Sequence, residues 1–156
     1  MVSVPGGLAS INNVTYFKLI EDKKANTQNE ILNTLKTIEQ EYDVTILLAI
    51  ESGSRAWGFP SEDSDYDVRF IYVHKPQWYL SIFKKRDVIE IPVDPVLDIN
   101  GWDLKKSLKL LRKSNPTLME WLSSPIVYTI NEPLLAPLKQ LAKTAFIPES
   151  SCHHYL

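Results

Sequence analysis

The chain has 156 residues, 44% hydrophobic and 23% charged, which is the composition of one globular domain with a sizeable core. A formal net charge of −2 gives no global electrostatic attraction to nucleic acid, and the single cysteine, Cys152, excludes an internal disulfide framework. The sequence shows neither a bilayer-spanning apolar run nor a signal-peptide pattern, so we expect a soluble cytoplasmic protein without membrane contact.

The first 25 residues show little periodicity, and the Pro-Gly-Gly break at residues 5–7 favours an N-terminal extension that is partly ordered at best. Within this extension, residues 15–20 have the composition of a short strand. A helix is predicted from Asn26 or Thr27 to about Tyr42, because apolar residues recur there at helical spacing. The residues on that apolar face are Ile31, Leu35, Ile38 and Tyr42.

Two buried strands are predicted next in the chain. Residues 44–50 form a continuous apolar run rich in β-branched side chains, which favours a strand covered on both faces. Residues 53–64 read as a loop with one helical turn, and the composition of residues 67–73 favours a second pleated strand. A short helix is expected at residues 77–83. Two short strands, separated by prolines, are then expected at residues 88–91 and 96–99.

The C-terminal half is predicted to be mostly helical. Asp103 caps one helix, Asn115 precedes a helix that starts with proline, and Glu132 opens a last helix after a short strand at residues 126–130. In the first helix, Leu104, Leu108 and Leu111 are expected to point inward. The apolar residues of the second helix are Leu118, Met119, Trp121 and Leu122, and those of the last helix are Leu134, Leu138 and Leu141. This order predicts an α/β fold of the α+β type, a small mixed sheet flanked by helices.

Residues 51–69 carry the most informative polar pattern. Gly53-Ser54 directly follows the first buried strand, and glycine has no side chain to block a close approach by a ligand. If a helical turn starts at Ser54, its free N–H groups and the Ser54 hydroxyl are suited to a phosphate. Taken alone, however, a Gly-Ser pair after a strand is more often structural than functional.

Asp65 and Asp67 form the second part of this pattern. In a strand, side chains two positions apart share a face, so the two carboxylates would point the same way. Two carboxylates at the mouth of an apolar strand need an offsetting charge, and Mg²⁺, which prefers oxygen ligands, supplies one. The alternative is a solvated acidic turn, because Glu62, Asp63 and Ser64 precede them. The aspartates alone do not decide between these interpretations.

The combination resembles the core signature of the DNA polymerase β-type nucleotidyltransferase superfamily. In that signature, Gly-Ser ends one buried strand and an Asp-apolar-Asp-apolar pattern begins the next. In this chain, ten residues separate the two parts. The fuller string GSRAWGF…DSDYDVRF resembles one branch, the predicted nucleotidyltransferases that include proteins found with RNA-repair ligases. The resemblance extends over residues 47–128 and includes residues 97–106, 114–116 and 120–128.

The resemblance implies a nucleotidyltransferase fold and transfer of a nucleoside monophosphate from a nucleoside triphosphate to a hydroxyl, assisted by two Mg²⁺ ions or by Mn²⁺ in their place. It implies that Asp65 and Asp67 hold metal together with a third carboxylate from a neighbouring strand. Asp98 is the preferred third ligand because it lies between apolar strand residues. Asp94 and Asp103 are its competitors, and Asp103 also has the role of helix cap.

The same resemblance implies that Gly53 and Ser54 hold the triphosphate, and it leaves two arginine roles open. Arg69 shares the face of the aspartates that precede it, where it either contacts phosphate or pairs with a carboxylate such as Asp98. Arg55 either meets the triphosphate from the helical turn or is exposed to solvent, and we favour exposure. All four residues are candidate nucleotide-binding residues.

Two weaker signals concern nucleic acid. One predicted helix has a basic face made by Lys105, Lys106, Lys109, Arg112 and Lys113. Such a face suits an RNA strand, but a solvated helix face is the more common explanation. Tryptophans at positions 57, 102 and 121 suit base stacking, although core packing is the usual role and is expected for Trp121 in particular.

We expect a nucleotidyltransferase domain over residues 26–150. In the resembled family, a His-Tyr-Leu stretch begins a helical second domain; here His154-Tyr155-Leu156 ends the chain, so residues 151–156 are interpreted as the start of a truncated domain. The acceptor stays open between RNA, a protein and a small molecule, and so does the oligomeric state. The alternative function is a non-catalytic, antitoxin-like partner-binding module, against which the retained aspartates argue.

Overall fold

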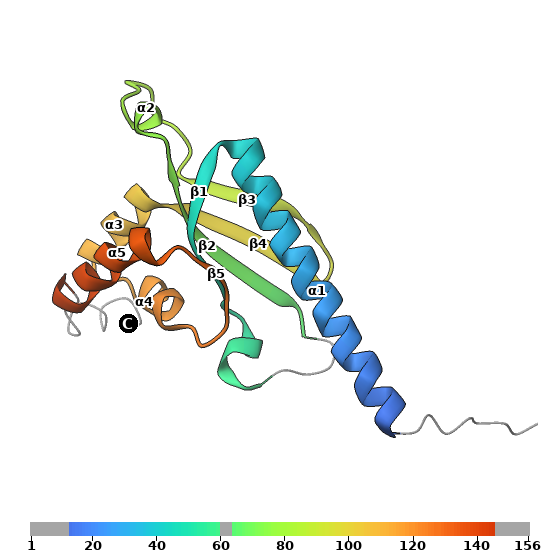
Figure 1. The fold of residues 1–156 in the computed structure, drawn as a ribbon. Helices are drawn as coiled ribbons and strands as arrows, with labels where there is room; N and C mark the ends of the chain where they lie inside the picture. The colour runs from blue at the N-terminus through green and yellow to red at the C-terminus, as the bar shows by residue number, and fades with distance from the viewer. Residues whose placement is uncertain (1–12, 60–63, 146–156) are drawn as a thin grey trace, which may run out of the picture.

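The computed structural model describes residues 13–59 and 64–145, in which five strands form one mixed sheet with helices against both faces (Figure 1). The strand order is β3-β4-β2-β1-β5. Neighbouring strands are antiparallel except β2 and β4, which are parallel. The predicted fold class, a small mixed sheet flanked by helices, is therefore confirmed.

The central strands are β1 (Val44–Glu51) and β2 (Tyr66–His74), and seven of the eight β1 residues are buried, as its apolar run predicts. The remaining strands are β3 (Val88–Asp94), β4 (Leu97–Asp103) and β5 (Val127–Ile130). Both β3 and β4 are longer than predicted. Strand β4 includes Gly101, and the ring of Phe70 occupies the space where a Cβ atom on this residue would lie.

Helix α1 (Asn13–Tyr42) packs along one face of the sheet, and its N-terminal part extends beyond it (Figure 1). The expected helix start at Asn26 or Thr27 is wrong, and residues 15–20, which have the composition of a short strand, belong to the helix. Residues 14–25 contain neither glycine nor proline, so nothing interrupts the helix there. Thr27, instead of capping, donates its hydroxyl to the carbonyl oxygen of Lys23 at 3.0 Å. The proposed domain boundaries stay a prediction, and residues 1–12 and 146–156 lie outside the described part.

The core next to α1 contains the predicted helix residues Ile31, Leu35 and Ile38, packed on Phe70 and other side chains of the sheet. Tyr42 was expected on the same face, but at the end of the helix it remains 42% exposed. Three of the four predicted α1 core positions are therefore confirmed.

The other face carries α3 (Leu104–Arg112), α4 (Pro116–Ser123) and α5 (Glu132–Ala145) (Figure 1). The predicted caps are confirmed: the carboxylate of Asp103 accepts from the backbone N–H of Lys105, and the side chain of Asn115 accepts from that of Leu118. Trp121 is buried as expected and stacks on Trp102. No described helix combines the length and apolarity needed to cross a membrane.

The expectation that Leu108 points inward from α3 is wrong, because it is 40% exposed, whereas Leu111 is buried. Of the three leucines named for the last helix, Leu138 is buried, and Leu134 and Leu141 are 48% and 49% exposed. In α5 the buried side chains are those of Leu135, Leu138 and Ala142. Two adjacent leucines at positions 134 and 135 fit two overlapping helical stripes, so periodicity alone cannot choose between them.

The short helix α2 (Pro76–Tyr79) lies at one end of the sheet, and the loop between β1 and β2 lies at the other (Figure 1). A helix had been expected over residues 77–83, but it ends at Tyr79. The residues that follow include three strongly exposed apolar side chains, Leu80, Ile82 and Phe83. They find no core to pack against, which removes the usual source of helix stability.

Candidate active site at the edge of the sheet

The candidate site begins where β1 ends. Gly53 has extended backbone angles and precedes the one-turn 3-10 helix η1 (Ser54–Trp57), so the helical turn expected at Ser54 is confirmed. The backbone N–H of Ser52 donates to the carbonyl oxygen of Asp67 at 2.9 Å and holds this loop against β2. The hydroxyl-bearing Ser54 is exposed at this position.

Gly53 packs directly against the carboxylate of Asp67. A Cβ atom on residue 53 would lie 2.1 Å from Oδ2 and 3.0 Å from Cγ of Asp67, far inside van der Waals contact. The loop backbone therefore approaches the carboxylate at a distance that only glycine permits unless Asp67 moves.

Asp67 and Asp98 are paired across the parallel strands β2 and β4, which places the two aspartates side by side. Between them lies Arg69, whose Nη2 is 2.8 Å from Oδ2 of Asp98 and 3.8 Å from Oδ1 of Asp67. Its Nη1 also donates to the backbone carbonyls of Val68 and Asp98. Of the two roles left open for Arg69, the ion pair with Asp98 is therefore the one that this structure contains.

Asp65 has no register partner in β4. It is exposed and lies one residue before β2 begins, and its expected alignment with Asp67 stays a prediction. The second oxygen of Asp98 accepts from Nδ2 of Asn100 at 2.8 Å, a contact that sequence reasoning missed. Among the described residues, no three histidine, cysteine or acidic side chains lie close enough to hold a metal ion.

The two competitors of Asp98 lie elsewhere. Asp94 is exposed at the end of β3. Asp103 is fully buried at the opposite end of β4, where it caps α3 and accepts from the hydroxyl of Tyr79 at 2.7 Å. Only Asp98 of these three is the register partner of Asp67.

Arg55 is folded back onto its own loop. Its Nε and Nη2 donate to the carbonyl oxygen of Ser64 at 3.1 and 2.6 Å, and its guanidinium lies 4.0 Å from the centre of the Tyr66 ring. The expectation that Arg55 is exposed is therefore wrong. The contacts tie η1 to the segment that leads into β2, so Arg55 fixes the distance between the two ends of the loop.

Glu51 is the central residue that sequence reasoning missed. It is fully buried, and its Oε1 accepts from the backbone N–H of Asp67 at 2.8 Å and of Gly53 at 3.3 Å. One buried carboxylate thus holds the backbone of both residues. A charged residue at the end of an otherwise apolar run was the available signal, because a buried charge requires partners.

Glu51 is itself held by the segment around β5. The Tyr128 hydroxyl donates to Oε2 of Glu51 at 2.6 Å, and the Ser124 hydroxyl donates to its backbone carbonyl at the same distance. Burial, together with this hydrogen bond to Glu51, raises the pKa of Tyr128 above its ordinary value, so the phenol remains protonated and able to donate.

Comparison with known proteins gives two matches. A family model described as the RNA repair pathway DNA polymerase beta family matches residues 27–156. The chain is also 57% identical over 129 residues to the uncharacterized protein YcgL of Bacillus subtilis (strain 168), a match that covers 83% of this chain and 50% of that protein. The chain therefore spans half the length of this relative. No solved structure matches.

Proposed function

Because this chain belongs to the RNA repair pathway DNA polymerase beta family, we propose that it transfers a nucleoside monophosphate from a nucleoside triphosphate to a hydroxyl at the sheet edge where Asp67 and Asp98 meet. Family membership points to nucleotidyltransferase-type chemistry. The observation that carries the finer proposal is the register pair of Asp67 and Asp98, with Gly53 packed against the first of them.

The donor set of this edge fits Mg²⁺ bound together with substrate. Asp67 and Asp98 offer hard carboxylate oxygens from adjacent strands, and Mg²⁺ is commonly held by one or two carboxylates while water and phosphate complete its shell. We propose that Asp65, exposed just before β2, joins them as the third ligand. When bound, one or two Mg²⁺ ions, or Mn²⁺, would neutralise phosphate charge and lower the pKa of the attacking hydroxyl.

Arg69 would have to change partner when a metal binds. In this structure its guanidinium supplies the positive charge between Asp67 and Asp98. A second cation at the same place would repel it, so Arg69 would release Asp98. Its planar guanidinium suits a triphosphate oxygen just as well as a carboxylate, and we assign it that role during the reaction.

The remaining roles follow from position. Gly53 brings the loop backbone beside Asp67, next to where the triphosphate would bind, and the exposed Ser54 hydroxyl donates to a phosphate oxygen. Arg55 acts on the nucleotide indirectly, by holding the loop. The acceptor oxygen attacks the α-phosphorus, the bond from that phosphorus to the leaving oxygen breaks, and pyrophosphate departs. Asp98 takes the proton of the acceptor hydroxyl.

The acceptor class remains a choice among RNA, a protein and a small molecule, and the family description favours RNA. One observation favours the alternative, a non-catalytic partner-binding module: Arg69 already forms an ion pair with Asp98 and lies 3.8 Å from Asp67, and the described residues contain no three-ligand cluster. A module of this kind would fold normally and bind no nucleotide.

Calorimetric titration of the four nucleoside triphosphates, with and without Mg²⁺, tests the proposal. We expect Mg²⁺-dependent binding by the wild type that is lost in Asp67→Asn and in Asp98→Asn. Asp22→Asn is the matched control, because it removes one negative charge from an exposed position on α1 and should bind like the wild type. A folded wild type that binds no nucleotide would overturn the proposal in favour of the module, and retained binding in both site variants would place the nucleotide elsewhere.

A further inference from the structure

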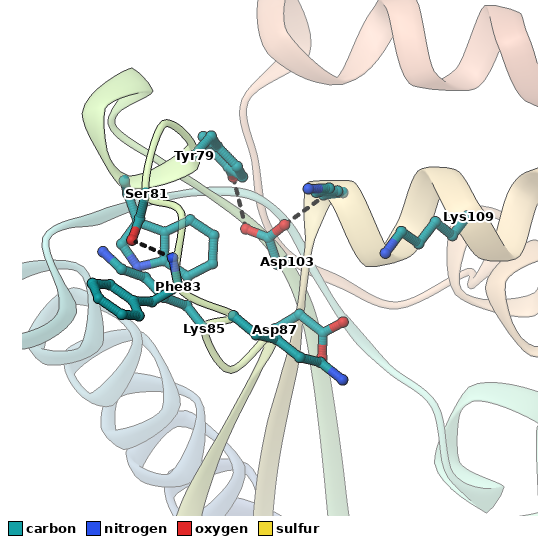
Figure 2. A pocket seen from close by; sticks show the side chains of 10 residues that line it. Tyr79, Ser81, Phe83, Lys85, Asp87, Asp103 and Lys109 are labelled. Carbon is teal, nitrogen blue, oxygen red and sulfur yellow. Dashed lines mark hydrogen bonds between the residues drawn. The ribbon is translucent and has the colours of Figure 1, made fainter.

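The end of the sheet opposite the candidate active site carries a second group of chemically matched side chains. Two cavities of about 130 and 240 Å³ flank the segment that follows β2, and both are lined by Trp78 and Lys85. We call them the lysine cavity, which Figure 2 shows, and the aromatic cavity. None of the catalytic roles proposed above uses a residue of either cavity.

The aromatic cavity has an unusual polar group in its wall. Tyr72 is fully buried, and its hydroxyl is the one buried side-chain polar atom among the described residues that has no hydrogen-bond partner. Burial raises the pKa of Tyr72, so the group is a protonated donor. A buried donor without a partner is rare in native proteins, which makes this hydroxyl a candidate for a bond to a group outside the chain.

Flat rings surround this hydroxyl. The His74 ring stacks on Trp78 at 3.8 Å with an interplanar angle of 5°, and Tyr72 meets His74 edge-on at 5.5 Å. Tyr42, at the end of α1, also lines the cavity. Burial lowers the pKa of His74, so its ring is uncharged at neutral pH. The charged side chains that line the cavity are Lys85 and the ion pair of Arg86 with Glu90. Flat rings with one free hydroxyl match a nucleobase, which offers a π face and a polar edge.

The lysine cavity supplies positive charge. Lys84, Lys85, Lys105 and Lys109 line it, and none of the four forms an ion pair within the described residues. Its two carboxylates are already engaged. Asp103 accepts from the hydroxyl of Tyr79, as Figure 2 shows, and from the backbone N–H of Lys105. Asp87 lies 3.8 Å from Nζ of Lys106. The ammonium group of Lys85 lies 5.3 Å from the centre of the Trp78 ring, and none of the four lysines has a carboxylate partner among the described residues, so all four remain available to an external anion.

A single-stranded chain of nucleotides combines both requirements. Its phosphates need unpaired cations, and an unstacked base can enter a cavity that a paired base cannot reach. Phe83, 78% exposed beside the lysines, offers a further face for stacking. Although the chain as a whole has a net charge of −2, the local charge of this surface is positive.

We propose that this surface binds single-stranded nucleic acid, with one unstacked base hydrogen-bonded to the Tyr72 hydroxyl in the aromatic cavity and the flanking phosphates on the four lysines. His74 lies seven positions after Asp67 in β2, which corresponds to roughly 23 Å. The surface is therefore separate from the candidate active site, and the inference does not depend on the proposed function.

Fluorescence anisotropy with a labelled 12-nucleotide RNA of mixed sequence, its DNA counterpart and the RNA duplex tests the proposal at several salt concentrations. We expect both single strands to bind and the duplex to bind more weakly. In Lys105→Gln/Lys109→Gln, affinity should fall at least about tenfold, and the slope of log K against log salt should decrease by about 1.4, because each lost phosphate contact contributes about 0.7. Lys36→Gln/Lys143→Gln, which removes two exposed lysines from α1 and α5, should bind like the wild type.

Tyr72→Phe gives the sharper test. Because the hydroxyl has no partner among the described residues, its removal should leave the melting temperature unchanged or slightly raised, while single-strand affinity falls about fivefold. Asp67→Asn should bind the oligonucleotides normally, which keeps the two proposals separable. Equal losses in the two lysine pairs, no binding by wild type, or unchanged affinity in Tyr72→Phe would overturn the proposal. So would binding to phosphatidylserine vesicles alone, which would assign the exposed Leu80, Ile82 and Phe83 to a membrane surface.

Discussion

Replacing Gly53 by alanine tests the candidate active site with a single methyl group. The φ angle of −80° is open to any residue, so the backbone itself is not strained by the change. The new Cβ, however, would lie 2.1 Å from Oδ2, 3.0 Å from Cγ and 3.1 Å from Cβ of Asp67. Since carbon atoms in contact prefer about 3.5–4.0 Å, the carboxylate has to move by more than roughly 1 Å.

The size of the effect follows from what that displacement removes. The Asp67 side chain is 34% exposed, so it can turn toward solvent, and the loss of stability should be limited to about 1–3 kcal/mol. Loss of ligand orientation typically lowers metal affinity by about 10–100-fold. We therefore expect calorimetric titration in Mg²⁺ to show ATP affinity reduced by about 10–100-fold in Gly53→Ala, at a temperature where the variant is folded.

Two other glycines provide controls. Gly58 has a φ of +81° and open space around its missing Cβ, so Gly58→Ala should lower stability by about 1–2 kcal/mol and leave ATP affinity unchanged. Gly101→Ala would place a Cβ 2.3 Å from the Phe70 ring and should destabilise the core without touching the candidate site. ATP affinity in Gly53→Ala within threefold of wild type would refute the argument that Asp67 binds the metal at this position.

Three further changes separate the roles of individual side chains. Arg69→Met removes the cation beside Asp98, so the apparent affinity for Mg²⁺ alone should rise while the affinity for ATP falls, both measured by calorimetry. A fall in both affinities would show that Arg69 is needed to position the aspartates. Tyr128→Phe leaves one oxygen of the buried Glu51 without its donor and should destabilise the fold by about 1.5–3 kcal/mol, or roughly 3–12 °C in melting temperature; an unchanged melting curve would contradict the proposed role of this bond. Because burial lowers the pKa of His74, the folded state favours the neutral ring, and its contribution to stability is present above pH 6.5 and lost as the pH falls through the folded-state pKa. His74→Gln should therefore flatten the decline of melting temperature between pH 7 and 5, and an equally steep decline would exclude His74 as its source.

Local chemistry was enough to predict much of the fold. The apolar run of β1, the cap at Asp103 and the Asn115-Pro116 helix start each depend on neighbouring residues only, and all three agree with the structure. Asp98 was expected to project from a strand, and the parallel register places it beside Asp67. The assignment of metal and nucleotide to these residues stays a prediction.

The features that the sequence did not reveal depend on distant partners or on missing stop signals. The burial of the Glu51 carboxylate is explained by its hydrogen bond with Tyr128, which lies 77 residues later in the chain. The sequence suggests an exposed Arg55, but in the fold it contacts the Ser64 carbonyl and the Tyr66 ring. Helix α1 starts earlier than predicted because residues 14–25 contain no helix breaker, although few of their side chains pack against anything.

The pairing of β5 with β1 also has a consequence for biosynthesis. Strand β1 leaves the ribosome before its partner on that side exists, since Glu51 and Tyr128 are 77 residues apart. At a translation rate of about 5–20 residues per second, synthesis of Tyr128 follows that of Glu51 by about 4–15 s. During this time the apolar edge of β1 is uncovered and the Glu51 carboxylate lacks its donor. An uncovered edge of this kind invites association between nascent chains. Translation speed between these two points should therefore influence how much of the protein is recovered in soluble form.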